Sequence, residues 1–160
     1  MEDREARLKD VARIAAVLEA KTGCPAPLLI AQWAVESDWG AKPVGRFNCF
    51  GMKRAARHSQ GCVVPTREVI DGETVVLDLE FADYDSLEDS CRDYACLITN
   101  GEPYHAAWER YRSDRDLHAL IATVAHVYAT DPNYARLVAA IASQKDVVEA
   151  IAAGRAEVAA

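Results

Sequence analysis

The chain has 160 residues, of which 51% are apolar, and a formal net charge of −7. This length and composition predict one domain over residues 1–160, with a core large enough to fold alone. The acidic balance argues against a nucleic-acid partner, because phosphate backbones demand clustered Lys and Arg. The longest apolar run, residues 25–31, is far shorter than the roughly 20 residues of a membrane span, so we expect no membrane insertion.

The N-terminal part of the chain predicts two helices. The first covers about residues 4–21 and stops at Gly23. One apolar stripe runs along it, formed by Leu8, Val11, Ala12, Ala15 and Leu18. Pro25 and Pro27 open the second helix, because proline is tolerated in a first turn. This helix is apolar on most sides until it ends near Trp39-Gly40, so we expect it to be central and buried.

An irregular segment and a hairpin follow. Residues 41–60 are rich in Gly, Pro, Asn and basic residues, which is typical of a long ordered loop. Residues 62–70 are rich in β-branched side chains, Asp71-Gly72 is a strong turn pair, and residues 74–84 return as the second strand. Strand alternation places Glu68 on the same face as Val64, Thr66 and Ile70.

The remainder of the chain is predicted to be helical. Ser86 caps a helix that closes at Asn100-Gly101. Ser113 and Asp116 resemble a capping box before a helix over 117–128. Thr130-Asp131-Pro132 restarts the chain into another helix, and the Ala-rich end from Asp146 either extends that helix or frays. The predicted fold class is therefore mainly α (α+β), with one inserted β-hairpin.

Cysteine and histidine spacing predicts no metal site and no cofactor. The cysteine count of five is odd, and the pair Cys91 and Cys96 fits neither a redox motif nor a zinc knuckle. We expect five reduced, mostly buried thiols. The four histidines lack the His-x-x-x-His spacing of a zinc-binding helix.

Glu36 is the strongest candidate for a catalytic group. It lies in the last turn of the apolar helix, between Trp33 and Trp39. Burial against indole and the partial negative charge of a helix C-terminus both favour the protonated carboxyl. A carboxyl group with a raised pKa is what a glycosidase needs to protonate a leaving oxygen. Glutamates near helix ends are more often solvated, so the surrounding sequence decides the case.

That surrounding sequence resembles glycoside hydrolase family 73, the peptidoglycan glucosaminidases of flagellar rod proteins, autolysins and phage lysins. Residues 27–40, PLLIAQWAVESDWG, are similar to the family's Ala-Leu-Glu-Ser-x-Trp-Gly pattern, and 48–53, NCFGMK, to its Leu-Phe-Gly-Ile-Lys segment. Further matches are TRE at 66–68, FADY at 81–84 and YATDPNYA at 128–135. The ordered set covers about residues 27–137. Among the departures, Asp38 often corresponds to Gly and would raise the pKa of Glu36 further.

The resemblance implies a lysozyme-like helical core, with the hairpin flanking the substrate groove. Glu36 matches the family's general acid, and Glu68 its second carboxylate on a mobile hairpin. Glu68 then acts either as base on a water, giving inversion, or as a charge stabiliser while the 2-acetamido group of the sugar attacks. Among the family's tyrosines, Tyr128 is expected to contact the acetamido group or the developing charge.

The resemblance also implies substrate contacts for several other residues. These are Asn48, Phe50, Gly51, Asp131 and Tyr134. We expect Asp131 to be an N-cap first and a site residue second. We expect Tyr134 to pack mainly in the core with Leu137 and Val138, and Trp33 to fill the core as well.

The predicted function is hydrolysis of the β-1,4 bond after N-acetylglucosamine in peptidoglycan glycan strands, by a monomer. One alternative is a lytic transglycosylase or muramidase, which cleaves after N-acetylmuramic acid. Another is a non-catalytic wall-binding or assembly module. Residues 1–10 lack the apolar stretch of a secretory signal, so we expect synthesis in a cytoplasm and action on the wall after release or export. A phage or prophage lysin is the expected setting, ahead of a tail component or an exported bacterial enzyme.

Overall fold

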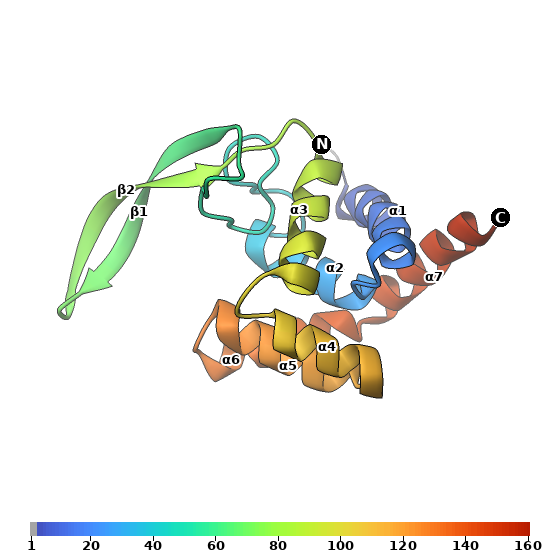
Figure 1. The fold of residues 1–160 in the computed structure, drawn as a ribbon. Coiled ribbons are helices and arrows are strands. Elements are labelled where there is room, and N and C mark those ends of the chain that lie inside the picture. Colours follow the sequence, from blue (N-terminus) through green and yellow to red (C-terminus); the bar gives the residue numbers. More distant parts are fainter. Residues whose placement is uncertain (1–2) are drawn as a thin grey trace.

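The computed structural model describes residues 3–160 and consists of a helical body from which a β-hairpin projects as an arm (Figure 1). The described residues form seven helices and one two-stranded antiparallel sheet. The predicted fold class, mainly α with one inserted hairpin, is therefore confirmed. No helix within residues 3–160 is long and apolar enough to cross a membrane.

Helix α2 (Ala26–Ser37) lies at the centre of the body, as its all-round apolar sequence predicts. It contacts four other helices, α1 (Arg4–Thr22), α3 (Leu87–Asn100), α6 (Pro132–Ala142) and α7 (Lys145–Ala159). Leu28, Leu29 and Ile30 are fully buried. The helix ends two residues earlier than expected, because Asp38 and Trp39 adopt left-handed backbone angles that turn the chain away.

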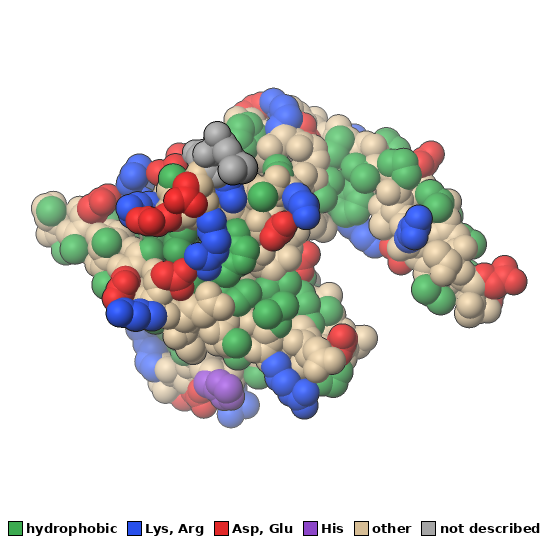
Figure 2. Space-filling model, turned by 180° about the vertical axis from the view of Figure 1, so that it is seen from behind, with side chains coloured by type: hydrophobic (Ala, Val, Ile, Leu, Met, Phe, Trp, Pro, Cys, Tyr) green, Lys and Arg blue, Asp and Glu red, His purple; other side chains and the backbone are tan. Residues whose placement is uncertain are grey.

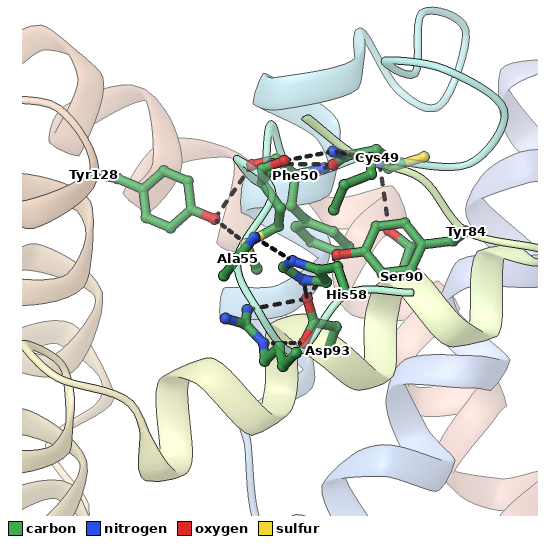
Figure 3. A network of polar contacts seen from close by, with 12 residues as sticks. Cys49, Phe50, Ala55, His58, Tyr84, Ser90, Asp93 and Tyr128 are labelled. Carbon is green, nitrogen blue, oxygen red and sulfur yellow. Dashed lines mark hydrogen bonds and ion pairs between the residues drawn. The ribbon is translucent and has the colours of Figure 1, made fainter. Parts of the chain in front are cut away.

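The expected loop over residues 41–60 is tied to α3 by a polar network around Asp93 (Figure 3). The Asp93 carboxylate accepts hydrogen bonds from Arg57, His58 and Tyr84, the last at 2.6 Å. His58 Nδ1 in turn accepts the backbone N–H of Ala55 at 2.8 Å. Because these contacts satisfy the buried groups of an irregular segment, the loop has a defined shape without regular secondary structure.

The hairpin forms as the sequence predicts. Strands β1 (Gly61–Ile70) and β2 (Glu73–Ala82) pair in antiparallel register, with Glu68 opposite Val75. The turn residues Asp71 and Gly72 both have positive φ angles, which a two-residue turn of this hand requires.

The C-terminal half contains one helix that the sequence did not reveal, α4 (His105–Asp114). Ser113 lies inside α4, so the predicted capping box with Asp116 is wrong. Asp116 alone caps α5 (Leu117–Tyr128), its side chain accepting the backbone N–H of Ala119 at 2.9 Å. The predicted caps Ser86 of α3 and Asp131 of α6 are confirmed.

The Ala-rich C-terminus neither extends α6 nor frays. Helix α6 ends before Ser143-Gln144, and a separate helix, α7, begins after these two residues and packs along α1. Gly154 makes this approach possible, because a Cβ there would stand 2.7 Å from a backbone carbonyl oxygen of α1. Ion pairs between Arg4 and Asp146 and between Arg155 and Glu19 join the same two helices, both at 2.7 Å.

The cysteines follow the expectation of reduced and mostly buried thiols. None of the five forms a disulfide within residues 3–160. Cys24, Cys49 and Cys91 are buried, whereas Cys62 is half-buried and Cys96 is exposed. The buried thiols therefore act as small apolar side chains of the core.

Candidate active site

The C-terminal end of α2 meets α6 and the loop that follows α2, and this junction holds Glu36. The Glu36 side chain is half-buried, with contacts to Tyr134 of α6 and to Gly51 of the loop. Seen from behind, the surface is deeply hollowed between the projecting hairpin and the helical body (Figure 2). A half-buried carboxyl group has one property that a general acid needs, namely limited hydration.

Burial raises the pKa of Glu36 above the ordinary carboxyl value, and a hydrogen bond from the Tyr134 hydroxyl partly opposes this rise. The expected contribution of Asp38 is not the cause. The Asp38 carboxylate is exposed and pairs with Lys42 at 3.0 Å. The pKa of Glu36 is therefore raised by burial, which the sequence predicted, and not by the charge of Asp38.

The two indoles near Glu36 are engaged with other groups. Trp33 is 1% exposed and packs edge to face on Trp39, with ring centroids 6.2 Å apart. The guanidinium of Arg4 lies 3.6 Å above the Trp39 ring. Trp33 therefore fills the core, as expected, and the tryptophan pair fastens the end of α2 to α1.

Because Gly51 has no side chain, the space next to the Glu36 carboxyl group is left open. A Cβ at this position would stand 3.3 Å from Glu36 Oε2, and the residue has a φ of 63°. Glycine is thus favoured both by the left-handed backbone and by the close approach to the acid. The family resemblance implies a further reason, namely that a glycine at the groove lets a sugar approach the backbone.

Asn48 shapes the loop that carries Gly51. The Asn48 side chain is 1% exposed and its amide nitrogen donates to the carbonyls of Met52 and Ala82, both at 2.9 Å. Its Oδ1 accepts the backbone N–H groups of Phe50 and Met52. All four hydrogen bonds that the amide can make are made within the protein. We therefore infer that Asn48 stabilises the loop and does not contact a sugar.

The ring of Phe50 does not line the groove. It is fully buried and stacked on Tyr94, with ring centroids 4.4 Å apart. Its carbonyl oxygen accepts a hydrogen bond from the Tyr128 hydroxyl at 3.3 Å (Figure 3). Burial raises the pKa of Tyr128 well above its usual range, so this hydroxyl stays protonated and holds the backbone next to Gly51.

Tyr134 packs against the core, as expected, and its hydroxyl has a further role. Its hydroxyl donates to Glu36 Oε1 and accepts from Gln32 Nε2 at 3.2 Å. Leu137, its expected packing partner, is 49% exposed, whereas Val138 is buried. Helical spacing identifies the face of α6 that turns inward, but it does not show that a phenol on that face ends at a carboxylate.

Two residues of this junction were missed by the sequence analysis, Gln32 and Tyr94. Gln32 is fully buried in α2, and the Tyr94 hydroxyl donates to its Oε1. A signal for Gln32 was available, because a glutamine inside an otherwise apolar helix requires hydrogen-bond partners. No comparable signal marks Tyr94, whose spacing in α3 is that of an ordinary core residue.

Glu68 lies outside this junction, whereas Asp131 adjoins it, because the Asp131 carbonyl oxygen accepts the backbone N–H of Tyr134 at 3.0 Å. Glu68 is half-buried near the tip of the hairpin arm, whereas Glu36 belongs to the helical body (Figure 1). Asp131 is exposed, and its carboxylate caps α6 by accepting the N–H of Asn133 at 2.9 Å. Within residues 3–160 no group of three His, Cys, Asp or Glu side chains is arranged to hold a metal ion.

A second concavity of about 720 Å³ lies elsewhere, between α1 and the N-terminal end of α3. Its lining includes the apolar side chains of Ile14, Val17, Phe47 and Leu87, but not Glu36. We place the candidate active site at Glu36 because this half-buried carboxyl group has a raised pKa and lies next to the backbone of Gly51.

Known proteins resemble this chain over most of its length. The family model described as "Mannosyl-glycoprotein endo-beta-N-acetylglucosaminidase" (glucosaminidase) matches residues 12–146. The chain is 32% identical over 146 residues to the peptidoglycan hydrolase FlgJ of Salmonella typhimurium, covering 87% of this chain and 44% of FlgJ. It is 30% identical over 148 residues to a probable N-acetylmuramidase of Lactococcus lactis, covering 88% of this chain and 33% of that protein. The chain thus spans less than half the length of these relatives.

Solved structures show the same fold. The glycoside hydrolase domain of Salmonella typhimurium FlgJ, C-terminally truncated, has a TM-score of 0.70 at 27% identity and covers 89% of this chain and 97% of that one. The catalytic domain of the autolysin Auto from Listeria monocytogenes has a TM-score of 0.79 at 23% identity, covering 92% and 86%. The family match and these relatives confirm the resemblance seen in the sequence: the chain belongs to the glucosaminidase family, glycoside hydrolase family 73.

Proposed function

We propose that this domain hydrolyses the β-1,4 glycosidic bond after N-acetylglucosamine in peptidoglycan, with Glu36 as the general acid. The observation that carries the proposal is the raised pKa of a half-buried Glu36 next to the open backbone of Gly51. The substrate class is supported by the FlgJ relative, which is named a peptidoglycan hydrolase.

The acid step uses the two oxygens of Glu36 differently. The proton passes from the carboxyl to the leaving glycosidic oxygen as the bond between that oxygen and the anomeric carbon breaks. The carboxylate that remains accepts a hydrogen bond from Tyr134, which stabilises the charge it has just gained. If Glu68 is the base, the attacking water gives its proton to Glu68, and proton exchange with solvent then restores both carboxyl groups. If the acetamido group attacks, the water that opens the resulting cyclic intermediate gives its proton to Glu36.

Glu68 supplies the second carboxylate in this proposal. In the free protein it stands on the hairpin arm, and we propose that the arm lies over the glycan in the complex. Glu68 then either deprotonates the attacking water, which requires the two carboxyl groups to be about 6.5–9.5 Å apart, or stabilises the charge while the 2-acetamido group attacks. The half-buried face that Glu68 shares with Val64 and Thr66 supports an inward orientation.

Tyr128 contributes a hydroxyl at the inner wall of the site. Its bond to the Phe50 carbonyl fixes the backbone beside Gly51, and we propose that its oxygen also meets the acetamido group of the bound sugar. A tyrosine with a strongly raised pKa remains a hydrogen-bond donor over the whole working range of a wall hydrolase.

The bond that is cut can be identified by digesting purified peptidoglycan and analysing the fragments by mass spectrometry. N-acetylglucosamine at the new reducing ends supports the proposal. The Lactococcus lactis relative is named a probable N-acetylmuramidase, so N-acetylmuramic acid at the reducing ends is the second candidate outcome. Anhydro-muramyl ends would instead assign the domain to the lytic transglycosylases.

A non-catalytic wall-binding module is distinguished by a simpler measurement. The domain is mixed with a suspension of cell walls, and turbidity is followed across a range of pH. Clearing supports the hydrolase, whereas sedimentation of the protein with walls that never clear would favour the binding module.

A further inference from the structure

Gln32 is a fully buried amide in a helix whose other buried side chains, apart from Ser37, are apolar. It precedes Glu36 by four residues, so the two side chains lie on the same face of α2, one turn apart. Burying an amide is costly unless its hydrogen bonds are made. The partners of Gln32 therefore indicate what the residue does.

These partners form a series of hydrogen bonds in which every donor points toward Glu36. The Tyr94 hydroxyl donates to Gln32 Oε1, and Gln32 Nε2 donates to the Tyr134 hydroxyl oxygen at 3.2 Å. A hydroxyl has one proton to give. Because the Tyr134 oxygen receives the N–H of Gln32, its own proton is directed to Glu36 Oε1.

The direction of these hydrogen bonds determines which oxygen of Glu36 carries the acid proton. Oε1 is an acceptor for Tyr134, so in the neutral carboxyl the proton belongs on Oε2. Oε2 is the oxygen that faces Gly51, where a Cβ would stand only 3.3 Å away. The transferable proton is thus held on the side where the backbone leaves room for a sugar oxygen.

We propose that Gln32 is a positioning residue, which orients the Tyr134 hydroxyl and thereby places the proton of Glu36 on Oε2. This rests on the proposed function, in which Glu36 is the general acid. Tyr94, at the far end of this series of hydrogen bonds, is held firmly. It is fully buried and its ring stacks on that of Phe50, with ring centroids 4.4 Å apart. A rigid anchor fixes the Gln32 amide in one orientation, which a solvated residue could not do.

The effect of Tyr134 on the pKa of Glu36 supports a positioning role for Gln32. Burial raises the pKa of Glu36, and the hydrogen bond from Tyr134 lowers it. A weaker donation from Tyr134 should therefore raise the pKa of Glu36 further. If Gln32 acts only by orienting Tyr134, its removal should have no separate effect once the Tyr134 hydroxyl is gone.

A double-mutant cycle tests the proposal. Gln32→Met keeps the length of the side chain and removes its hydrogen bonds, Tyr134→Phe removes the hydroxyl, and the third variant combines both. The pKa of Glu36 is measured by NMR titration of labelled carboxyl carbons, and kcat and KM by release of soluble glycan. Each single variant should raise the pKa of Glu36 and lower kcat about tenfold, with KM changing less than about twofold. The double variant should match Tyr134→Phe alone.

Two further variants keep the result decisive. Tyr94→Phe leaves the stacked ring in place and removes only the anchoring hydroxyl, so it should shift the pKa of Glu36 in the same direction even if Gln32→Met folds poorly. Thr99→Val removes another buried hydroxyl of α3, which bonds the Ala95 carbonyl at 2.9 Å, and should leave both the pKa and kcat unchanged.

The outcomes separate the two proposals. Additive effects of Gln32→Met and Tyr134→Phe, or a Glu36 pKa that Gln32→Met and Tyr94→Phe both leave unmoved, overturn the positioning role while Glu36 stays the acid. Coupled pKa shifts in a protein whose Glu36→Gln variant keeps full activity would instead overturn the proposed function.

Discussion

Tyr134 and Glu36, 98 residues apart in the chain, share a hydrogen bond in which the phenol donates to the carboxyl group. This contact joins α6 to the end of α2. It also sets two opposing influences on the acid, because burial raises the pKa of Glu36 and the donated proton lowers it.

Replacing Glu36 by glutamine should abolish turnover on purified peptidoglycan without unfolding the protein. Glutamine keeps the shape and can still accept from Tyr134, but it has no acidic proton to give. Clearing of a wall suspension measures activity, and circular dichroism checks the fold. Glu109→Gln, which changes an exposed carboxylate of α4 paired with Arg112 at 3.0 Å, is the matched control and should retain activity. Near wild-type clearing by Glu36→Gln would remove Glu36 from the mechanism.

The pH profile should show that activity persists above the range in which an ordinary carboxyl group ionises. The general acid must be protonated, and burial raises the pKa of Glu36 above 4.5. The alkaline limb of kcat/KM against pH reports this group in the free enzyme. In Tyr134→Phe the limb should move to higher pH, because the opposing hydrogen bond is lost. A limb that moves to lower pH, or stays in place, contradicts this account of the site.

Stability should depend on pH through the same group. The folded protein holds the Glu36 proton more tightly than the unfolded chain, since the folded-state pKa is raised. This contribution is present below the ordinary pKa and is lost as pH rises through the raised one. Denaturant unfolding of wild type across that window should therefore show a decline in free energy that Glu36→Gln lacks. Equal declines in the two proteins would argue against a buried acid.

Replacing Glu68 by glutamine should lower the hydrolysis rate by a factor of about ten to a thousand, the usual contribution of one base or charge-stabilising group. Glu80→Gln changes another carboxylate of the same hairpin, one that pairs with Arg54, and should have a much smaller effect. Rates are compared at saturating substrate. If the two variants behave alike, Glu68 is a solvated charge on an exposed strand and no part of the reaction.

Replacing Gly51 by alanine should lower kcat more than stability. The new methyl group would crowd Glu36 Oε2 at 3.3 Å and would sit on a backbone with a φ of 63°. The strain costs about 1 kcal/mol of unfolding free energy. Gly72→Ala is the control, because this turn glycine has a φ of 80° but nothing within 4 Å of its Cβ position. A similar loss of kcat in both variants would mean that backbone strain, and not access to Glu36, is responsible.

Much of the fold could be predicted because the responsible signals are local. The apolar surface of α2, the Asp71-Gly72 turn and the cap Ser86 each act within a few residues, so spacing and residue type reveal them. Helix α4 could not be predicted from the sequence. Trp108 is the only residue of this helix that is buried in the structure, so its apolar side chains do not repeat at helical spacing.

The proposal of Glu36 as the acid also comes from the sequence, since the motif around Glu36 and its place in a buried helix are both visible there. The tertiary structure decided what surrounds that acid. Packing of α6 on α2 brings Tyr134 to Glu36, the anchor Tyr94 reaches Gln32 from α3, and the ring of Phe50 turns into the core. Spacing along one element shows which face is buried, whereas the partner met on that face depends on how distant elements dock, and no local pattern encodes this.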